Sequence, residues 1–336
     1  MKNSNIDLGH IHFGIDGKAL AMNPRLRQRL KLRELAILME VVAANGIGKA
    51  ALRLHVSQPV VSKAIASLER TFGVRLLDRT IQGVTLTEYG RAILKCGIAM
   101  FDDLKKGMEE VDFINDPTVG EVRVGCTEIE FTGIVSEVIY RLAPKYPRMK
   151  FNVVRVDQAA PYRELEARKV DFLITRLGGS PKDSHLDTEL LYNESIVVAV
   201  GSQSIWARKR KVDLAELVNE PWLLPPPGSF VEEIIEEAFA VCGLNAPEPT
   251  FIGTSTDMRV ALLSNGHFIT VCPRGMLQIL AKRLPIKALP IALPRKLRPV
   301  GITTLRGRSL TPVSHVFLDC AREVAKPLAT AHQGFP

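Results

Sequence analysis

Three short segments near the start of the chain carry apolar residues at helical spacing. The first segment has its apolar stripe at Leu32, Leu35, Ala36, Met39, Val42 and Ala43, and Asn45-Gly46 then breaks the helix. A second, shorter segment runs through Ala50, Ala51 and Leu54. The third shows apolar positions at steps of four, three and four: Val61, Ile65, Leu68 and Phe72. An apolar strand from Val74, a Gln82-Gly83 turn and a returning strand at 84–86 follow. This order predicts a winged helix-turn-helix over residues 32–90.

The third helix has a clear start signal and a polar face. Ser57 can cap the helix, and Pro59 fits its first turn because the N–H that proline lacks has no intrahelical partner there. The apolar stripe leaves a second set turned outward: Gln58, Pro59, Ser62, Lys63, Ala66 and Arg70. Gln can pair with adenine, Lys with guanine or a phosphate, Ser with several base edges, and Pro with a thymine methyl group. From these residues alone, an ordinary surface helix remains the alternative.

Basic residues lie on both sides of this helix. Arg79 stands near Gln82 at the wing, where it is expected to reach a phosphate or the minor groove. Residues 1–31 form an N-terminal extension, and a basic run begins near its end: Arg25, Arg27, Arg29, Lys31 and Arg33. Residues 1–90 hold 13 Lys and Arg against 7 Asp and Glu, whereas the remaining residues hold 31 against 29. This excess of positive charge favours double-stranded DNA as the partner.

A long amphipathic helix is expected from residue 88 to about residue 114. Thr87 caps it and Asp116-Pro117 ends it, so the segment 88–116 forms a linker between domains. Heptad counting gives a seam for two-stranded dimerisation: Leu94, Phe101, Leu104, Met108 and Val111, with Gly97 and Ile98 beside it. The alternative is a helix packed on its own domain. We favour dimerisation because a small winged domain offers a long helix little core, and a dimer can address half-sites about 34 Å apart.

About sixty residues of this region resemble the N-terminal signature of LysR-type transcriptional regulators. The matching residues are Ala50, Ala51, Leu54, Val56, Ser57, Gln58, Pro59, Val61, Ser62, Lys63, Ile65, Leu68, Glu69, Gly73, Val74, Leu76, Leu77, Arg79, Gly83, Val84, Leu86, Thr87 and Gly90. The chain departs at Gly46 and Gly48, where the family usually has a hydroxyl residue, and at Val60, where it usually has Ala. The resemblance implies a regulator that binds DNA through Ser57, Gln58, Pro59, Ser62, Lys63 and Arg79, and commonly a tetramer.

From residue 117 onward, apolar strands alternate with helices, which indicates a parallel α/β sheet. We expect strands at 121–125, 151–157, 170–175, 195–201, 222–224, 250–253, 268–272, 286–289 and 299–305. Helices are expected at 133–146, 162–169, 214–218, 230–242, 258–264 and 312–326. If the last strand and helix rejoin the first sheet, one lobe comprises 117–194 and 286–330, and the other 195–285.

This order is similar to the LysR-type effector domain, which has the two-lobed architecture of periplasmic binding proteins. The expected fold class is therefore α+β multidomain, with a winged helix-turn-helix, a long linker helix and a two-lobed α/β effector domain over residues 117–330. Small molecules bind such sheets beyond the carboxyl ends of the strands, near helix N-termini.

Polar residues at those strand ends are the candidate effector contacts: Thr127, Gln158, Arg176, Ser229 and Thr254. Arg176 directly follows a buried strand, and a guanidinium suits bidentate capture of a carboxylate or phosphate. A surface salt bridge is the alternative for Arg176. The resemblance implies effector contacts at several of these positions, whereas Ile129 stands where relatives often have a hydroxyl residue. An anionic effector is the candidate ligand class.

Other functional classes have little support in the sequence. It contains no GxSxG, P-loop, HExxH or helix-opening GxGxxG motif, so we expect no enzyme, catalytic residue or cofactor. Five scattered cysteines without a CxxC pair argue against a zinc site and for a reducing compartment. His10 and His12 are at most a weak metal pair, and no metal is expected. No segment reaches the roughly twenty apolar residues of a membrane span.

The first residues lack a secretory signal, so we expect a cytoplasmic protein. We predict a sequence-specific, effector-responsive DNA-binding regulator that forms a homo-oligomer: a dimer and, by resemblance, a tetramer. The alternatives are a solute-binding protein with the same two-lobed domain, and a redox sensor that uses Cys126 or Cys272.

Overall fold

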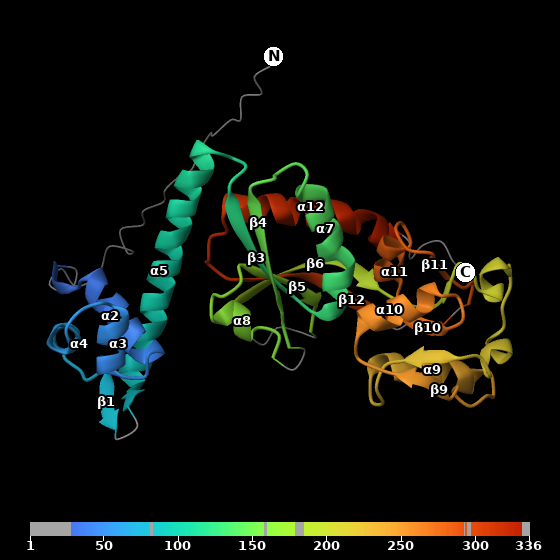
Figure 1. Cartoon of the computed structure of the whole chain (residues 1–336), viewed down its shortest axis with the longest axis horizontal. Helices are drawn as coiled ribbons and strands as arrows, with labels where there is room; N and C mark the ends of the chain where they lie inside the picture. The colour runs from blue at the N-terminus through green and yellow to red at the C-terminus, as the bar shows by residue number, and fades with distance from the viewer. Residues whose placement is uncertain are drawn as a thin grey trace, which may run out of the picture. The chain divides into compact units, whose positions relative to one another are not determined.

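A computed structural model describes residues 28–80, 83–157, 160–178, 185–291, 293 and 297–330 (Figure 1). The chain divides between Asp102 and Asp103 into two compact units. His10, His12, Arg25, Arg27, Gln82 and Gln158 lie outside the described residues. In the described part of the chain, no single helix is long and apolar enough to cross a membrane, and only α2 and α3, bent by 114°, pass that test as a pair.

The first unit begins with three helices and a two-stranded wing. The helices are α2 (Leu32–Ala43), α3 (Ile47–Arg53) and α4 (Gln58–Phe72), and the strands β1 (Leu77–Thr80) and β2 (Gly83–Leu86) pair antiparallel. Gly73 ends α4 in the left-handed conformation, with φ 72°, which glycine adopts without strain. The winged helix-turn-helix predicted from the sequence is therefore present.

The buried face of the first helix differs from the prediction. Its buried residues are Glu34, Leu35, Ile37, Leu38 and Val41. Leu32 is 46% exposed and Ala43 is also exposed, although the sequence placed both on the apolar stripe. In α4 the prediction was right, because Val61, Ile65 and Leu68 are buried. Gly46 and Gly48 flank the start of α3, whose Ala50 and Ala51 pack in the core of this unit.

Helix α5 (Glu88–Asn115) follows the wing without a loop. The hydroxyl of Thr87 accepts a hydrogen bond from the N–H of Gly90 at 2.9 Å, which is the predicted cap. A Cβ on Gly90 would lie 2.0 Å from the carbonyl oxygen of Leu76, so only glycine fits between α5 and the wing. Further along, Ile93 and Phe101 pack against the core of the first unit, and Gly97 faces Leu35 and Met39. The first half of α5 thus has a core of its own to pack on.

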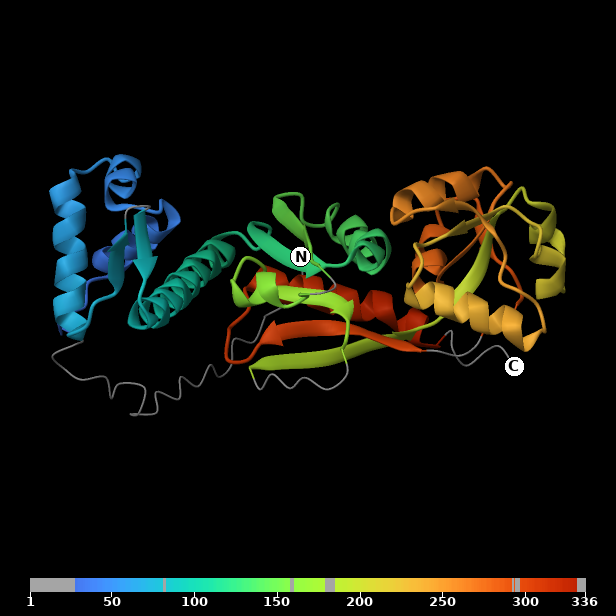
Figure 2. The same ribbon diagram turned by 90° about the horizontal axis from the view of Figure 1, so that it is seen from below.

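The second unit contains two five-stranded mixed sheets, one in each lobe. The sheet of lobe 1 has the order β4 (Met149–Arg155), β3 (Gly120–Cys126), β5 (Phe172–Arg176), β12 (Arg298–Leu305) and β6 (Leu186–Glu194). The first three strands are parallel, and β12 runs antiparallel to both of its neighbours. The long strands β12 and β6 lie side by side (Figure 2).

Helices cover the lobe 1 sheet on both faces. One face is covered by α6 (Glu128–Glu130), the π-helix η1 (Phe131–Val135), α7 (Ser136–Leu142) and α12 (Pro312–Thr330), and its core includes the ring contact of Phe172 with Phe317 at 5.6 Å. The short helix α8 (Arg163–Glu166) lies over a smaller apolar cluster around Leu165 and Leu173.

The sheet of lobe 2 has the order β11 (Ile286–Ala288), β7 (Ile196–Gly201), β10 (Ile269–Pro273), β8 (Trp222–Leu224) and β9 (Pro249–Ile252). Its helices are η2 (Ile205–Arg208), η3 (Leu214–Leu217), α9 (Phe230–Val241), α10 (Thr256–Ser264) and α11 (Arg274–Leu280). Trp222 is fully buried, packs edge-on against Phe239, and donates its indole N–H to the carbonyl oxygen of Leu217 at 2.8 Å.

Four sequence expectations for the second unit need correction. The sheets are mixed rather than parallel, because β12, β6 and β7 run against their neighbours. The sequence missed β6 and α11 entirely. It assigned residues 286–289 to lobe 1, whereas β11 pairs with β7 in lobe 2. The single helix expected at 133–146 is instead the succession α6, η1 and α7, which starts earlier and ends sooner. The last strand and helix do rejoin the first sheet, as predicted.

Candidate DNA-binding and effector-binding sites

Helix α4 presents its polar residues outward. Ser57, Gln58, Pro59 and Lys63 are exposed, and Ser62 is half-buried. Ser57 is the N-cap residue, with extended backbone, but its side chain makes no capping hydrogen bond, so the predicted capping contact is absent. Gln58 lies near α3, since a Cβ on Gly48 would be 3.9 Å from its side-chain oxygen. Position 48 therefore borders the outward face of α4 that the sequence predicts to contact DNA, a proximity that the sequence did not reveal.

The wing places Arg79 in β1, opposite Val84 in the hairpin register. Its backbone is thus held by the antiparallel ladder one residue before the strand end, and its side chain is outside the description. Lys31 and Arg33 of the N-terminal basic run are exposed at the start of α2. These positions give the first unit basic residues ahead of α2, on α4 and in the wing.

Two of the predicted effector residues meet a buried acid in lobe 1. Thr127 follows β3, is buried, and donates its hydroxyl hydrogen to the carboxylate of Glu130. Arg176 ends β5 and is half-buried. Burial raises the pKa of Glu130, and the Thr127 hydrogen bond and the charge of Arg176 partly offset that rise. Thr127 and Arg176 therefore share one neighbour, which the sequence did not single out.

A second buried acid, Glu194, lies where β6 leads into β7 and the chain passes from lobe 1 to lobe 2. Its carboxylate accepts hydrogen bonds from the N–H groups of Ser195 at 3.1 Å and Gly275 at 2.9 Å. Burial raises the pKa of Glu194 to about 7, against the effect of these two N–H groups, and the charge of Glu130 raises it further. The available signal for Glu194 was an acid directly before the predicted strand at 195–201, and for Glu130 an acid in the segment that follows the predicted strand at 121–125.

The remaining candidates lie in lobe 2 or outside the description. Ser229 caps α9, and its hydroxyl accepts the N–H of Glu232 at 3.2 Å. Thr254 is exposed, one residue before Ser255, which caps α10. Arg298 interacts electrostatically with residues of both lobes. Burial lowers the pKa of Arg298 most, the charge of Arg176 in lobe 1 lowers it further, and the charge of Glu233 in α9 of lobe 2 raises it. No hydrogen bond among the described residues joins Ser229 or Thr254 to Thr127 or Arg176.

Two cavities in the described part of lobe 2 do not coincide with the predicted site. A groove of about 790 Å³ lies at the amino ends of β8 and β9, lined by Val218, Asn219, Glu220, Pro221, Gly243, Leu244, Asn245, Ala246, Pro247, Glu248, Thr250 and His267. A much smaller cavity, about 10 Å³, lies beside α10 and is bordered by Thr256, Arg259, Cys272 and Met276 among others.

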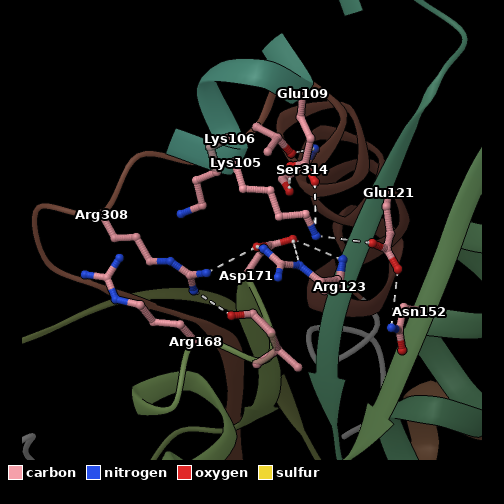
Figure 3. Close-up of polar contacts among 12 residues, drawn as sticks. Lys105, Lys106, Glu109, Glu121, Arg123, Asn152, Arg168, Asp171, Arg308 and Ser314 are labelled. Atoms are coloured by element: carbon pink, nitrogen blue, oxygen red, sulfur yellow. Dashed lines mark hydrogen bonds and ion pairs between the residues drawn. The ribbon is translucent and has the colours of Figure 1, made fainter. Parts of the chain in front are cut away.

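Charged side chains, of which Lys106 is buried, connect the second half of α5 to lobe 1 (Figure 3). Lys106 is 4% exposed and donates to the carbonyl oxygen of Ser309 at 2.7 Å. Asp103 accepts from Arg168 at 3.3 Å, and Lys105 lies 3.8 Å from Glu121. Beneath them, the buried Asp171 accepts from Arg123 at 2.7 Å. Residues 103–109 of α5 are thus anchored at the amino ends of β3 and β5.

The cysteines proposed for redox sensing are both buried. Burial raises the pKa of Cys126 to about 12 and that of Cys272 to about 12. Oxidation proceeds through the thiolate, which these values disfavour. No group of three or more His, Cys, Asp or Glu side chains in the described residues is arranged to hold a metal.

Known families match both units of this chain. Residues 32–91 match the bacterial regulatory helix-turn-helix protein, lysR family, and residues 115–326 match the LysR substrate binding domain. The second match alone covers more than half of the chain. The chain belongs to the LysR family. It is a LysR-type DNA-binding transcriptional regulator with an effector-binding domain, and members of this family are not enzymes.

Relatives within the LysR family align over nearly their whole length. The regulator GbpR of Azospirillum brasilense is 26% identical over 298 residues, which are 88% of this chain and 87% of GbpR. The transcriptional dual regulator GltC of Bacillus subtilis (strain 168) is 28% identical over 294 residues, which are 86% of this chain and 96% of GltC.

Solved LysR-type structures share the fold. Full-length CbnR complexed with its target DNA aligns with a TM-score of 0.53 and 21% identity, over 88% of this chain and 100% of CbnR. A full-length OxyR variant from Pseudomonas aeruginosa gives 0.56 and 19%, over 88% of this chain and 95% of OxyR. These similarities establish the architecture of a winged head, a long helix and two mixed α/β lobes.

Proposed function

We propose that this LysR-type regulator reads its operator through the outward face of α4. Ser57, Gln58, Pro59, Ser62 and Lys63 would contact the major groove, and Arg79 would contact the backbone or minor groove from the wing. The observation that carries this proposal is the division of α4 into a buried side and a polar, largely exposed side that begins at its N-terminus. The N-terminal residues of a recognition helix are the ones that meet base edges. The CbnR structure, solved with its target DNA, supports duplex DNA as the partner.

We also propose a homo-oligomer built on α5. Leu104, Met108 and Val111 are 51%, 64% and 58% exposed, and they continue an apolar stripe that starts at Met100. Their spacing of four and three residues fits a two-stranded seam. Of the other predicted seam residues, Leu94 is half-buried, and Phe101 packs on the core of its own unit. The second half of α5 is therefore the better supported part of the seam, and a tetramer rests on family resemblance alone.

The proposed effector is a small organic anion bound at the carboxyl ends of the strands. Arg176 supports this because its guanidinium stands at the end of β5 next to Glu130, which an incoming carboxylate could replace as partner. Thr127, Gln158, Ser229 and Thr254 would complete the site. A solute-binding protein would share these lobes but would have no use for a DNA-binding head, and the buried cysteines speak against a redox sensor. We propose a cytoplasmic location, where the operator is.

Footprinting on DNA from the region upstream of the protein's own gene tests the function. Purified full-length protein should protect a discrete segment against excess unspecific competitor. A panel of small carboxylates and sugars should include a compound that changes the length or the affinity of that footprint. Uniform protection of all sequences would contradict sequence-specific reading by α4. If no compound alters the footprint, the proposal that α4 reads the operator would stand, and carboxylates and sugars would be excluded as effector classes.

A further inference from the structure

The helical turn α6 of lobe 1 inserts into lobe 2. The carboxylate of Glu128 accepts a hydrogen bond from the backbone N–H of Thr256, at 2.5 Å, across 128 residues of sequence. The next side chain, Ile129, packs against the lobe 2 apolar cluster that includes Leu263 and Met276. Glu130 then turns back into lobe 1 beside Thr127. Consecutive residues of α6 therefore contact opposite lobes.

Glu128 occupies the positive end of a helix. Thr256 is the first residue of α10, a helix of 9 residues, and its N–H has no partner within the helix. The hydroxyl of Ser255 accepts the N–H of Met258 at 3.2 Å, so the two contacts together satisfy two of the free donors. A carboxylate at this position also gains from the helix dipole. The chain thus supplies its own anion at the end of α10.

The surroundings of this contact hold an unsatisfied donor. The Nε–H of Arg259, one turn along α10, is buried and finds no acceptor among the described residues, next to the small cavity bordered by Thr256 and Cys272. Burial lowers the pKa of Arg259, and Glu128 is among the groups that oppose this. Within the described residues of lobe 1, the basic partner of Glu128 is the largely exposed Arg155, at 3.7 Å. The positive groups of α10 are therefore the stronger partners of this carboxylate.

The segment around α6 makes further contacts between the lobes. The hydroxyl of Thr132 donates to the carboxylate of Asp257, in the first turn of α10, at 3.3 Å. Gly133 has no side chain, and a Cβ there would lie 3.5 Å from the Cα of Met276 in α11. Glu194 accepts the N–H of Gly275 at the start of the same helix. Carboxylates of lobe 1 thus meet the N-terminal ends of two lobe 2 helices.

We propose that Glu128 is an internal latch that holds α10 of lobe 2 against lobe 1 when no effector is bound. The inference rests on the proposed response to a small effector. An effector that brings an anionic group to this end of α10 has to displace Glu128, because two carboxylates cannot share one N–H at this distance. Only molecules in which Glu128 has left the Thr256 N–H can bind such an effector there. The apparent association constant is therefore the intrinsic constant multiplied by the fraction of those molecules. Displacement would release α10 from lobe 1 and change the relation of the two lobes.

Amide hydrogen exchange on the full-length protein, without DNA or effector, tests the latch. Glu128→Ala should raise the exchange rate of the Thr256 amide and its neighbours in α10 by roughly tenfold or more. Sodium formate should restore protection in Glu128→Ala and leave wild type unchanged, since formate supplies the missing carboxylate. Sodium chloride at equal ionic strength controls for screening. Glu323→Ala is the matched control, because Glu323 is an exposed acid of lobe 1 that pairs with Lys326, three residues along the same helix.

Three outcomes would overturn the latch: unchanged exchange in Glu128→Ala, equal protection by chloride and formate, or faster α10 exchange in Arg155→Ala, which would trace the effect to the ion pair within lobe 1. If Glu128→Ala does not fold, Glu128→Gln keeps the size of the side chain and should show a smaller increase in exchange. Because the experiment contains neither DNA nor effector, its failure leaves the footprinting result, and the proposed function, standing.

Discussion

The Nη2 atom of Arg308 lies 3.4 Å from Oδ1 of Asp171, and both side chains are 1% exposed. Arg123 approaches the same carboxylate at 2.7 Å, and Arg308 also donates to the carbonyl oxygen of Val170 at 2.5 Å. One buried acid therefore compensates two guanidinium groups at the end of lobe 1 where α5 is anchored (Figure 3). Removing that acid would leave buried charges without compensation, which is far more costly than losing an exposed pair.

We expect Asp171→Asn to destabilise the effector domain by about 3 kcal/mol. For a domain of this size, the transition temperature in differential scanning calorimetry should fall by roughly 6–12 °C. Asp319→Asn is the control, because Asp319 is 73% exposed in its pair with Arg322, and it should shift the transition by less than about 2 °C. Equal shifts of the transition temperature in the two variants would show that the buried Asp171 contributes no more to stability than an exposed acid.

The reading face of α4 predicts a loss of specificity without a loss of fold. Gln58→Ala and Lys63→Ala should each weaken operator binding by about 1–3 kcal/mol, since a lost base contact is of that size. Competition binding against unspecific DNA measures the ratio of affinities. Lys95→Ala, an exposed lysine of α5, should bind as wild type does. Arg79→Ala should instead weaken binding to all sequences alike, with a shallower salt dependence. A preserved affinity ratio in Gln58→Ala would contradict base reading by this residue.

The exposed stripe on α5 predicts an association defect. Leu104→Glu places a charge in the proposed seam of both subunits, so the dissociation constant of the dimer should rise at least about 100-fold. Sedimentation equilibrium over a range of concentrations gives this constant. Glu110→Gln changes an exposed residue of the same helix outside the stripe and should leave association intact. An unchanged dimer in Leu104→Glu, with normal circular dichroism, would place the interface elsewhere.

Arg176 predicts a ligand-dependent shift in stability. An organic anion from the footprinting panel should raise the transition temperature of wild type, because binding to the folded state stabilises it. The same compound should not shift Arg176→Ala. Arg163→Ala, which removes an exposed arginine at the start of α8, is the comparison variant and should respond as wild type does. Equal shifts in wild type and Arg176→Ala would exclude Arg176 from the site.

Glu194 predicts a pH dependence with a definite sign. Its pKa is raised from 4.5 to about 7 in the folded protein, so the folded state binds more protons than the unfolded state between these values. Its contribution is therefore most favourable below about pH 4.5 and is lost as the pH rises through about 7, by up to about 3 kcal/mol. Glu194→Gln should flatten the decline in stability between pH 5 and 8, as measured by urea denaturation. Since Glu130, Arg176 and Tyr192 surround this carboxylate, Arg176→Ala should steepen the decline.

Much of the fold could be predicted because many helix and strand boundaries are marked by capping and turn residues in the local sequence. Thr87, Pro59 and the Gln82-Gly83 turn mark boundaries in the sequence itself, and the structure follows them closely at α4, α5 and β2. The missed elements lack such marks. Strand β6 has a mostly exposed middle, with the polar pattern of an edge strand. Helix α11 starts directly at Pro273-Arg274-Gly275, which resembles a loop. In α2, we counted apolar residues at both ends of the helix as part of the buried stripe. The predicted buried face is therefore rotated by part of a turn from the observed one.

The candidate sites divide in the same way. The proposed DNA-binding face lies on one helix, so spacing alone was enough to predict its members. The proposed effector region combines segments about a hundred residues apart, and the acids near it, Glu128, Glu130 and Glu194, stand out only through what surrounds them. An acid near a strand end is ordinarily solvated. The packing of α6 between the lobes makes Glu128 and Glu130 unusual, and burial at the passage from β6 to β7 makes Glu194 unusual.

The five cysteines are unequal in a way that bears on experiment. Cys126 and Cys272 are sealed in the lobes and Cys320 is partly covered, whereas Cys96 on α5 and Cys242 after α9 are exposed. One accessible sulfur thus lies in each compact unit. Maleimide dyes or spin labels should attach to these two cysteines of the wild-type regulator without added mutations. The distance between the two labels would then report motion between the DNA-binding head and the effector domain.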